Sequence, residues 1–309
     1  MSASPFMNEA DAAGAQARDA LRPVQSAPAG NGALALDSAN LVARALAVLD
    51  QDKTRGGARS GDANIASRFP IRPVNLEPTL ATTDLRLQRR VLSDGAECFL
   101  PIRYFDVQCL VATFLAPPDK ALALVAGAGL QPVLQEDGRA VVDVYCIEYR
   151  KTDIGPYNEV GLTVRASAPG DPVAASYVVN LPVTTAVACR AGREIWGYNK
   201  FVAAIDVKCE GKTFSTVLRD RGREMIGALE GKRGVSVPAP AADILTFTLH
   251  HGQLMKTVIS VLTPSLASSG ESFVFKVGTS RHSMAGNLRD LVRIDRPLAL
   301  AALRIFVQA

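Results

Sequence analysis

Segments rich in β-branched and aromatic residues recur at short intervals from Tyr104 to the end of the chain, and this recurrence constrains the fold more than any other feature. Glu210-Gly211 and His251-Gly252 each separate two such segments and are typical of tight hairpin turns. Because a parallel crossover needs about a dozen residues or more, the short connections favour antiparallel pairing. The pattern predicts strands at Tyr104–Phe114, Ala140–Tyr149, Val160–Ala166, Ala174–Leu181, Phe201–Lys208, Lys212–Arg219, Ile244–His250, Gln253–Leu262, Ser272–Val277 and Ala302–Val307.

Few stretches of this region have a helical pattern. They are Pro118–Ala126, Thr184–Ile195 and His282–Leu291. In the second of these, threonines are available as an N-terminal cap and Gly197 can end the helix. Many antiparallel strands with few helices predict an α+β fold: a mostly antiparallel sheet, strongly curved or closed into a cone or barrel, with a few flanking helices.

The N-terminal part of the chain has a different composition. Residues 1–35 are rich in Ala, Gly, Ser and Pro without any period, which predicts a disordered tail. Within residues 36–80, Leu36–Asp52 has the apolar stripe of a short helix, and Thr54–Asp62 is polar and Gly-rich, as linkers are. We therefore expect one compact domain at residues 81–309, preceded by a tail, a short helix and a linker.

Composition and charge argue against several classes of partner. Hydrophobic residues make up 48% of the 309 residues and charged residues 21%, an ordinary balance for a globular protein with a sizeable core. The net charge is +4 and no basic run is interleaved with aromatic residues, so we expect no nucleic-acid partner. No apolar run approaches the ~20 residues of a membrane-spanning helix, so we expect no membrane partner.

Cysteine and histidine are not arranged as metal ligands. The cysteines are spread singly, without a Cys-x-x-Cys pair, which argues against a zinc site or a disulfide framework and favours a reducing, cytoplasmic location. His250 and His251 lie at a predicted hairpin tip, and with His282 they make a poor metal set. Glycine-rich nucleotide-binding loops and a Gly-x-Ser-x-Gly elbow are also absent. We expect neither a metal nor a cofactor.

One segment contains a candidate reactive residue. Residues 188–201 read ACRAGREIWGYNKF and include the single Trp of the chain. Lys200 lies where the predicted helix passes into an apolar strand, a place where a lysine can be forced inward. The alternative is a lysine that extends its ammonium group to solvent from the start of a strand.

The run from Gly192 to Lys200 resembles the acetoacetate decarboxylase family. That family has a Gly-Arg-Glu followed by aromatic-Pro-Lys-Lys, and its first lysine forms a Schiff base with the substrate ketone; Lys200 is the match. The segment 155–159, Gly-Pro-Tyr-Asn-Glu, resembles the family segment that ends in a glutamate facing the lysine, so Glu159 is the match. Arg-Tyr-Phe at 103–105 and LVRIDRP at 291–297 are also similar to family segments, and the resemblance covers about residues 98 to 309.

The resemblance implies roles for individual residues. Lys200 would attack a carbonyl, and Glu159 would move protons or orient the substrate. Arg103 would hold a substrate carboxylate in its planar fork. Tyr157, Trp196 and Phe201 are predicted to form pocket walls or core. The alternatives are a surface carboxylate for Glu159 and a surface or ion-paired side chain for Arg103.

Two departures from the family pattern bear on the reaction. Phe201 stands where the family has its second lysine, and the register of a further acidic residue falls near Val144 and Tyr145. These departures leave three function classes open. They are a β-keto-acid decarboxylase, a Schiff-base aldolase, dehydratase or cyclase on 2-oxo acids, and a non-catalytic binder of small ligands. The resemblance also implies a small-molecule keto-acid substrate and a homo-oligomer.

Overall fold

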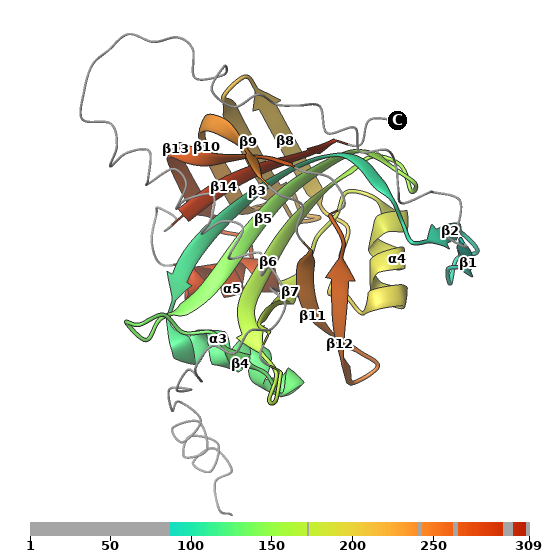
Figure 1. Ribbon diagram of the computed structural model, residues 1–309, viewed down its shortest axis with the longest axis horizontal. Helices are drawn as coiled ribbons and strands as arrows, with labels where there is room; N and C mark the ends of the chain where they lie inside the picture. The colour runs from blue at the N-terminus through green and yellow to red at the C-terminus, as the bar shows by residue number, and fades with distance from the viewer. Residues whose placement is uncertain (1–86, 172, 240–242, 262–264, 293–298, 307–309) are drawn as a thin grey trace, which may run out of the picture. The chain divides into compact units, whose positions relative to one another are not determined.

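The computed structural model describes residues 87–171, 173–239, 243–261, 265–292 and 299–306 (Figure 1). The predicted N-terminal tail, short helix and linker lie outside the described residues, and so does most of the predicted closing segment at 291–297.

The described part is mostly β-structure. Its helices are α3 (Pro118–Val125), α4 (Ala186–Trp196) and α5 (Ser283–Leu291), with a short 3₁₀ turn, η2 (Ala126–Ala128), after α3. The strands are β1 (Gln88–Val91), β2 (Glu97–Leu100), β3 (Tyr104–Ala116), β4 (Gln131–Pro132), β5 (Ala140–Thr152), β6 (Tyr157–Ser167), β7 (Ala175–Asn180), β8 (Ala204–Glu210), β9 (Thr213–Arg219), β10 (Met225–Ala239), β11 (Ile244–His250), β12 (Gln253–Ile259), β13 (Ser265–Val277) and β14 (Ala299–Phe306).

One large sheet holds most of these strands. Its order is β12-β11-β7-β6-β5-β3-β14-β13-β10-β9-β8, with β4 paired to β6, while β1 and β2 form a separate hairpin. Among the residues that the structure describes, every ladder is antiparallel except the one between β7 and β11, which confirms the predicted mostly antiparallel sheet with few helices. No ladder of the described residues joins β8 to β12, so a closed, strongly curved sheet remains a prediction.

Strand β10 is the longest element that the sequence pattern did not predict. Its sequence, MIGALEGKRGVSVPA, mixes glycines and charges and lacks a clear apolar alternation. The glycines have a packing role: Gly231 pairs with Phe273 on β13, and a Cβ added to Gly231 would lie 2.5 Å from Phe273 Cε1. Gly231 therefore makes room for a neighbouring aromatic ring, a purpose that a strand pattern does not reveal.

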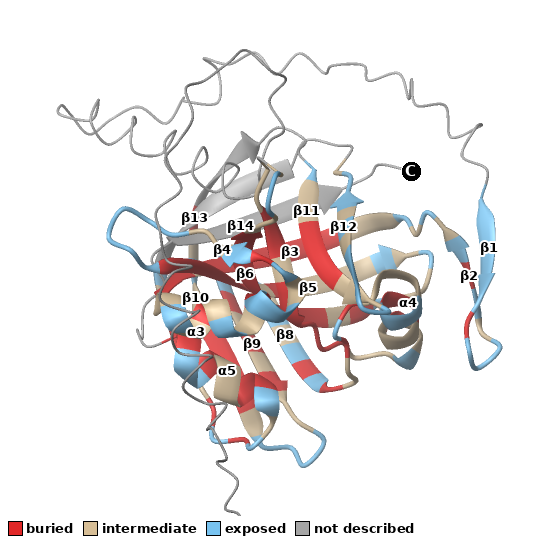
Figure 2. Cartoon of the chain, turned by 90° about the horizontal axis from the view of Figure 1, so that it is seen from below, coloured by how far each residue is buried: buried red, intermediate tan, exposed pale blue. Residues whose placement is uncertain are grey.

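The two faces of β5 and β6 pack against different partners. Val144 and Val160 point to the main core, as do alternate residues of β3, and helices α3 and α5 contact the same region. The opposite face carries Tyr149, Tyr157 and Glu159 and is covered by the start of α4. Buried residues dominate the centres of β3, β5 and β6, whereas β1 and β12 are largely exposed (Figure 2).

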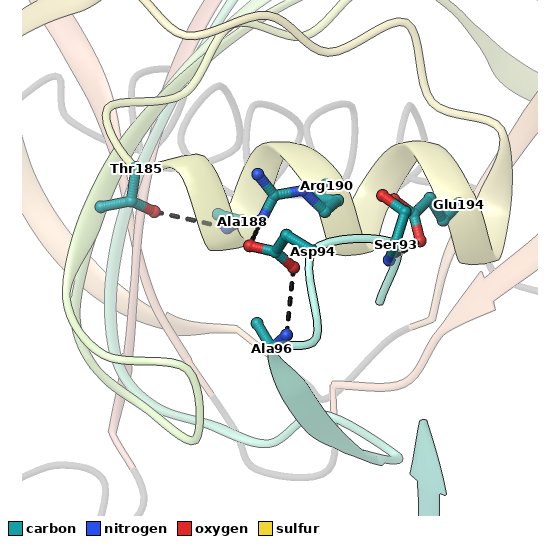
Figure 3. Close-up of polar contacts among 7 residues, drawn as sticks. All are labelled: Ser93, Asp94, Ala96, Thr185, Ala188, Arg190 and Glu194. Carbon is teal, nitrogen blue, oxygen red and sulfur yellow. Dashed lines mark hydrogen bonds and ion pairs between the residues drawn. The ribbon is translucent and has the colours of Figure 1, made fainter. Parts of the chain in front are cut away.

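Helix α4 lies apart from α3 and α5 and is held by the turn of the β1–β2 hairpin (Figures 1 and 3). The backbone N–H and Oγ of Ser93 donate to the carboxylate of Glu194 at 2.9 and 2.5 Å. Asp94 forms an ion pair with Arg190 on the same helix. Apolar contacts of Leu92 with the helix complete a clamp that joins segments about a hundred residues apart in sequence.

Candidate active site

The ends of helix α4 are set by ordinary capping. The Oγ1 of Thr185 accepts a hydrogen bond from the N–H of Ala188 at 3.4 Å, as an N-terminal cap does. At the other end Gly197 has φ 67°, and its N–H reaches the carbonyl of Arg193. The chain then turns back towards the helix, which brings the next residues of the motif over its inner face.

The segment that follows α4 is fixed by backbone hydrogen bonds to the segment after β7. The N–H of Leu181 donates to the carbonyl of Asn199 at 3.0 Å, and the N–H of Val183 donates to the carbonyl of Phe201 at 2.9 Å. Arg193 adds a bond of 3.2 Å from Nη1 to the carbonyl of Lys200. With the backbone held on both sides, the Lys200 side chain projects inward and is only 5% exposed.

Gly192 of the Gly-Arg-Glu run lies directly under the Lys200 side chain. A Cβ added at Gly192 would be 2.5 Å from Lys200 Cδ and closer still to Cε. Carbon atoms in contact normally lie about 3.5–4.0 Å apart. Only a glycine at this position therefore leaves space for the methylenes of Lys200 in their observed path.

Glu159 meets Lys200 in the protein interior. Glu159 lies on β6, opposite Ile147 of β5, and is 4% exposed. The Nζ of Lys200 donates a hydrogen bond to Oε2 of Glu159, and the pair forms a buried ion pair across 41 residues of sequence. The other carboxylate oxygen, Oε1, accepts a hydrogen bond from the hydroxyl of Tyr149 at 3.2 Å.

Aromatic rings surround this pair. The Nζ of Lys200 lies 5.8 Å from the ring centroids of both Tyr157 and Tyr198, within the range of a cation–π contact. Tyr149 stacks between Tyr104 and Tyr157, with ring centroids 5.0 and 4.5 Å away. Burial, the largest cause, and the charge of Glu159 raise the pKa of Tyr149 well above its ordinary value of 10.0. The site thus combines an amine, a carboxylate and a neutral phenol in an apolar enclosure.

The other residues singled out in the sequence lie at varying distances from this centre. Tyr157 belongs to the enclosure, and Trp196 packs beside Tyr198 with ring centroids 6.4 Å apart. Phe201 stacks on His282, with ring centroids 4.3 Å apart, and packs against the main core. Arg103 is exposed and binds Asp153 through Nε at 2.9 Å. Its role towards a substrate carboxylate stays a prediction.

Sequence reasoning missed Tyr149, Tyr198 and the spacing role of Gly192. Tyr149 faces Tyr157 across the β5–β6 hairpin. This register is centred on Asp153, and it places Tyr149 diagonally across from Glu159. The sequence pattern began this strand only at Val160, whereas β6 begins at Tyr157, so the glutamate lies on a buried strand.

None of the helices among the described residues is long and apolar enough to span a membrane. Within the same residues, no group of three or more His, Cys, Asp or Glu side chains is arranged to hold a metal ion.

The solved structures to which this chain is similar include acetoacetate decarboxylases and an enduracididine biosynthesis enzyme. The acetoacetate decarboxylase of Legionella pneumophila superimposes with a TM-score of 0.52 at 17% identity, over 70% of this chain and 91% of that chain. An acetoacetate decarboxylase-like enzyme from Sphingomonas wittichii RW1 gives a TM-score of 0.46 at 14% identity, over 66% and 88%. The enduracididine biosynthesis enzyme MppR, complexed with pyruvate, gives 0.43 at 14% identity, over 66% and 85%.

No curated protein matches the chain in sequence. The family model for acetoacetate decarboxylase (ADC) matches residues 92–258, which is more than half of the chain and includes both Lys200 and Glu159. The matched segment and the shared fold agree with the resemblance found in the motifs. The chain belongs to the acetoacetate decarboxylase family.

Proposed function

We propose that this protein is a Schiff-base-forming lyase that decarboxylates a β-keto acid such as acetoacetate, with Lys200 as the nucleophile and Glu159 as its base. The observation that carries the proposal is the buried contact between the two side chains. Burying a lysine and a glutamate has a desolvation cost that a pair of apolar residues would avoid. A chemical use explains why both charges lie in the interior of an enzyme-family fold.

The geometry supports the first half of the reaction. An amine must lose its extra proton before it attacks a carbonyl, and Oε2 of Glu159 is in position to take that proton from Nζ of Lys200. The new C–N bond converts the carbonyl oxygen into the hydroxyl of a carbinolamine, as a proton moves from nitrogen to oxygen. Glu159 then returns its proton to that hydroxyl, water leaves, and a cationic iminium remains.

The second half depends on the iminium as an electron sink. In a β-keto acid the bond to the carboxylate breaks, its electron pair moves into the iminium to give an enamine, and carbon dioxide leaves. Protonation of the enamine carbon and hydrolysis by water return the free amine and the ketone. The rings of Tyr157 and Tyr198 flank the nitrogen that carries the positive charge, where aromatic faces stabilise a cation.

A second candidate is a Schiff-base aldolase, dehydratase or cyclase that acts on 2-oxo acids. The observation that favours it is Phe201 in the place of the family's second lysine, with its ring packed on His282. Without that second cation beside Lys200, the site differs from the family pattern at the position next to the nucleophile. The same iminium would then serve carbon–carbon bond formation or loss of water instead of loss of carbon dioxide.

Reductive trapping tests both candidates. Sodium borohydride with acetoacetate or pyruvate should add one reduced adduct per chain at Lys200, and Lys200→Ala should abolish it. Lys256→Ala is the matched control, because Lys256 also pairs with a carboxylate, Asp171, at 2.6 Å but near the surface. An acetoacetate adduct that has lost carbon dioxide supports the decarboxylase, and an intact pyruvate adduct with no carbon dioxide from acetoacetate supports the alternative. Equal labelling of the Lys200→Ala variant would contradict the assignment, and absence of any adduct would favour a non-catalytic binder.

A further inference from the structure

We infer that Tyr149 is a positioning residue for Glu159: its hydroxyl holds one carboxylate oxygen so that the other faces Lys200. The inference deepens the proposed function and rests on it. It assigns a role to a side chain that lies on β5, outside the motif around the lysine, and that reaches Lys200 through Glu159.

The two oxygens of Glu159 have different partners. Oε1 accepts from the Tyr149 hydroxyl at 3.2 Å, and Oε2 accepts from Lys200 Nζ. Tyr149 and Glu159 lie on adjacent strands of one hairpin, two positions apart in register, so their side chains share a face. A carboxylate held at one oxygen has a fixed rotation about its last bond, which leaves a defined lone pair for the amine.

The hydroxyl of Tyr149 is itself held in place by its ring. The ring of Tyr149 packs against the rings of Tyr104 and Tyr157, whose centroids lie 5.0 and 4.5 Å from its own. Aromatic pairs at these separations are favourable contacts in their own right. Because ring packing sets the position of the hydroxyl, a phenylalanine at 149 would keep the stack and remove only the hydrogen bond to Glu159.

Tyr149 acts as a donor in every protonation state of its partner. Burial, followed by the charge of Glu159, raises its pKa well above 10.0, so the phenol keeps its proton at neutral pH. The hydroxyl can therefore donate to Oε1 while Oε2 takes a proton from the amine and later returns it. Without this donor, Oε1 loses its partner in a buried site and the carboxylate is free to turn both oxygens towards Lys200. Such a forked contact would hold the amine as an ammonium and slow its attack on a carbonyl.

A double-mutant cycle on the full-length protein tests the inference. The rate of borohydride-trapped adduct formation is measured in wild type, Tyr149→Phe, Glu159→Gln and the double variant, over a range of acetoacetate or pyruvate concentrations. Tyr149→Phe should lower the saturating rate by about 10-fold, as expected for losing a hydrogen bond to a charged group, with the half-saturating concentration unchanged. In the Glu159→Gln background the same substitution should have no further effect, because Tyr149 acts through Glu159.

The control is Tyr177→Phe, which removes a hydroxyl from a half-buried tyrosine of β7 that packs against the main core and not in the aromatic stack around Glu159. It should trap at the wild-type rate, and circular dichroism should show all variants folded at the assay temperature. A Tyr149→Phe variant as fast as wild type would overturn the inference, and so would an equal slowing in both backgrounds. Either failure leaves labelling at Lys200 intact, whereas failure of the proposed function would appear as labelling that persists in Lys200→Ala.

Discussion

Replacing Gly192 by alanine should displace the Lys200 amine without unfolding the protein. The added Cβ would lie 2.5 Å from Lys200 Cδ, about 1 Å less than the shortest ordinary contact of about 3.5 Å. The Lys200 backbone is held by Arg193, so the methylenes must move and carry Nζ away from Glu159. A displacement of about 1 Å at a reacting atom can lower a rate on the order of 10²-fold. We expect the rate of borohydride-trapped adduct formation to fall by about that factor.

A matched control separates this effect from that of a new alanine in a helix. Gly286 lies in α5, and a Cβ added there would meet nothing within 4 Å. Both substitutions gain up to ~1 kcal/mol of helix propensity. Gly286→Ala should therefore trap at the wild-type rate with an equal or higher melting temperature. If Gly192→Ala traps as fast as Gly286→Ala, the lysine chain relaxes without moving its amine, and the steric argument is refuted.

Further predictions concern stability. Thr185→Ala removes the cap of α4 and should lower the free energy of unfolding by about 1 kcal/mol, measured by urea denaturation; an unchanged midpoint would mean that the β1–β2 clamp alone holds the helix. Gly231→Ala forces a Cβ against Phe273 and should lower the melting temperature by several degrees, and a wild-type value would show that the ring moves aside at little cost. Burial raises the pKa of Cys146 from 9.0 to about 12, so its contribution to stability is complete below pH 9.0 and is lost as pH rises towards that higher value. The melting temperature should fall above about pH 9, less steeply in Cys146→Ala, and equal slopes in both proteins would contradict the assignment.

The strands that alternate cleanly and the capped helices are the parts of the fold that follow from local pattern. β9 and β11 have the bounds expected from their apolar alternation or differ by a residue, and α4 ends where Gly197 allows it to. β10 could not be predicted this way. Its glycines leave space for phenylalanine rings of β13, which is remote in sequence.

The candidate site likewise contains residues that local sequence predicts and residues that it does not. The motif around Lys200 and the segment that ends in Glu159 pointed to these two residues, and the structure brings their side chains into contact. Tyr149 carries no motif of its own, since its contact with Glu159 depends on the register of the β5–β6 hairpin. Register is a property of paired strands, so a reading of single segments does not give it.

The contact between Lys200 and Glu159 has a use in the study of how this chain folds. In the folded chain Glu159 bridges Val183 and Val183 bridges Val202, so the pair depends on tertiary structure that spans 41 residues. A contact between side chains this far apart in sequence is lost when the chain unfolds. An unfolded chain exposes all its lysines equally to keto acid and borohydride, whereas the proposed reaction would label one. The fraction of label at Lys200 would then report the population of folded molecules directly, without an added probe.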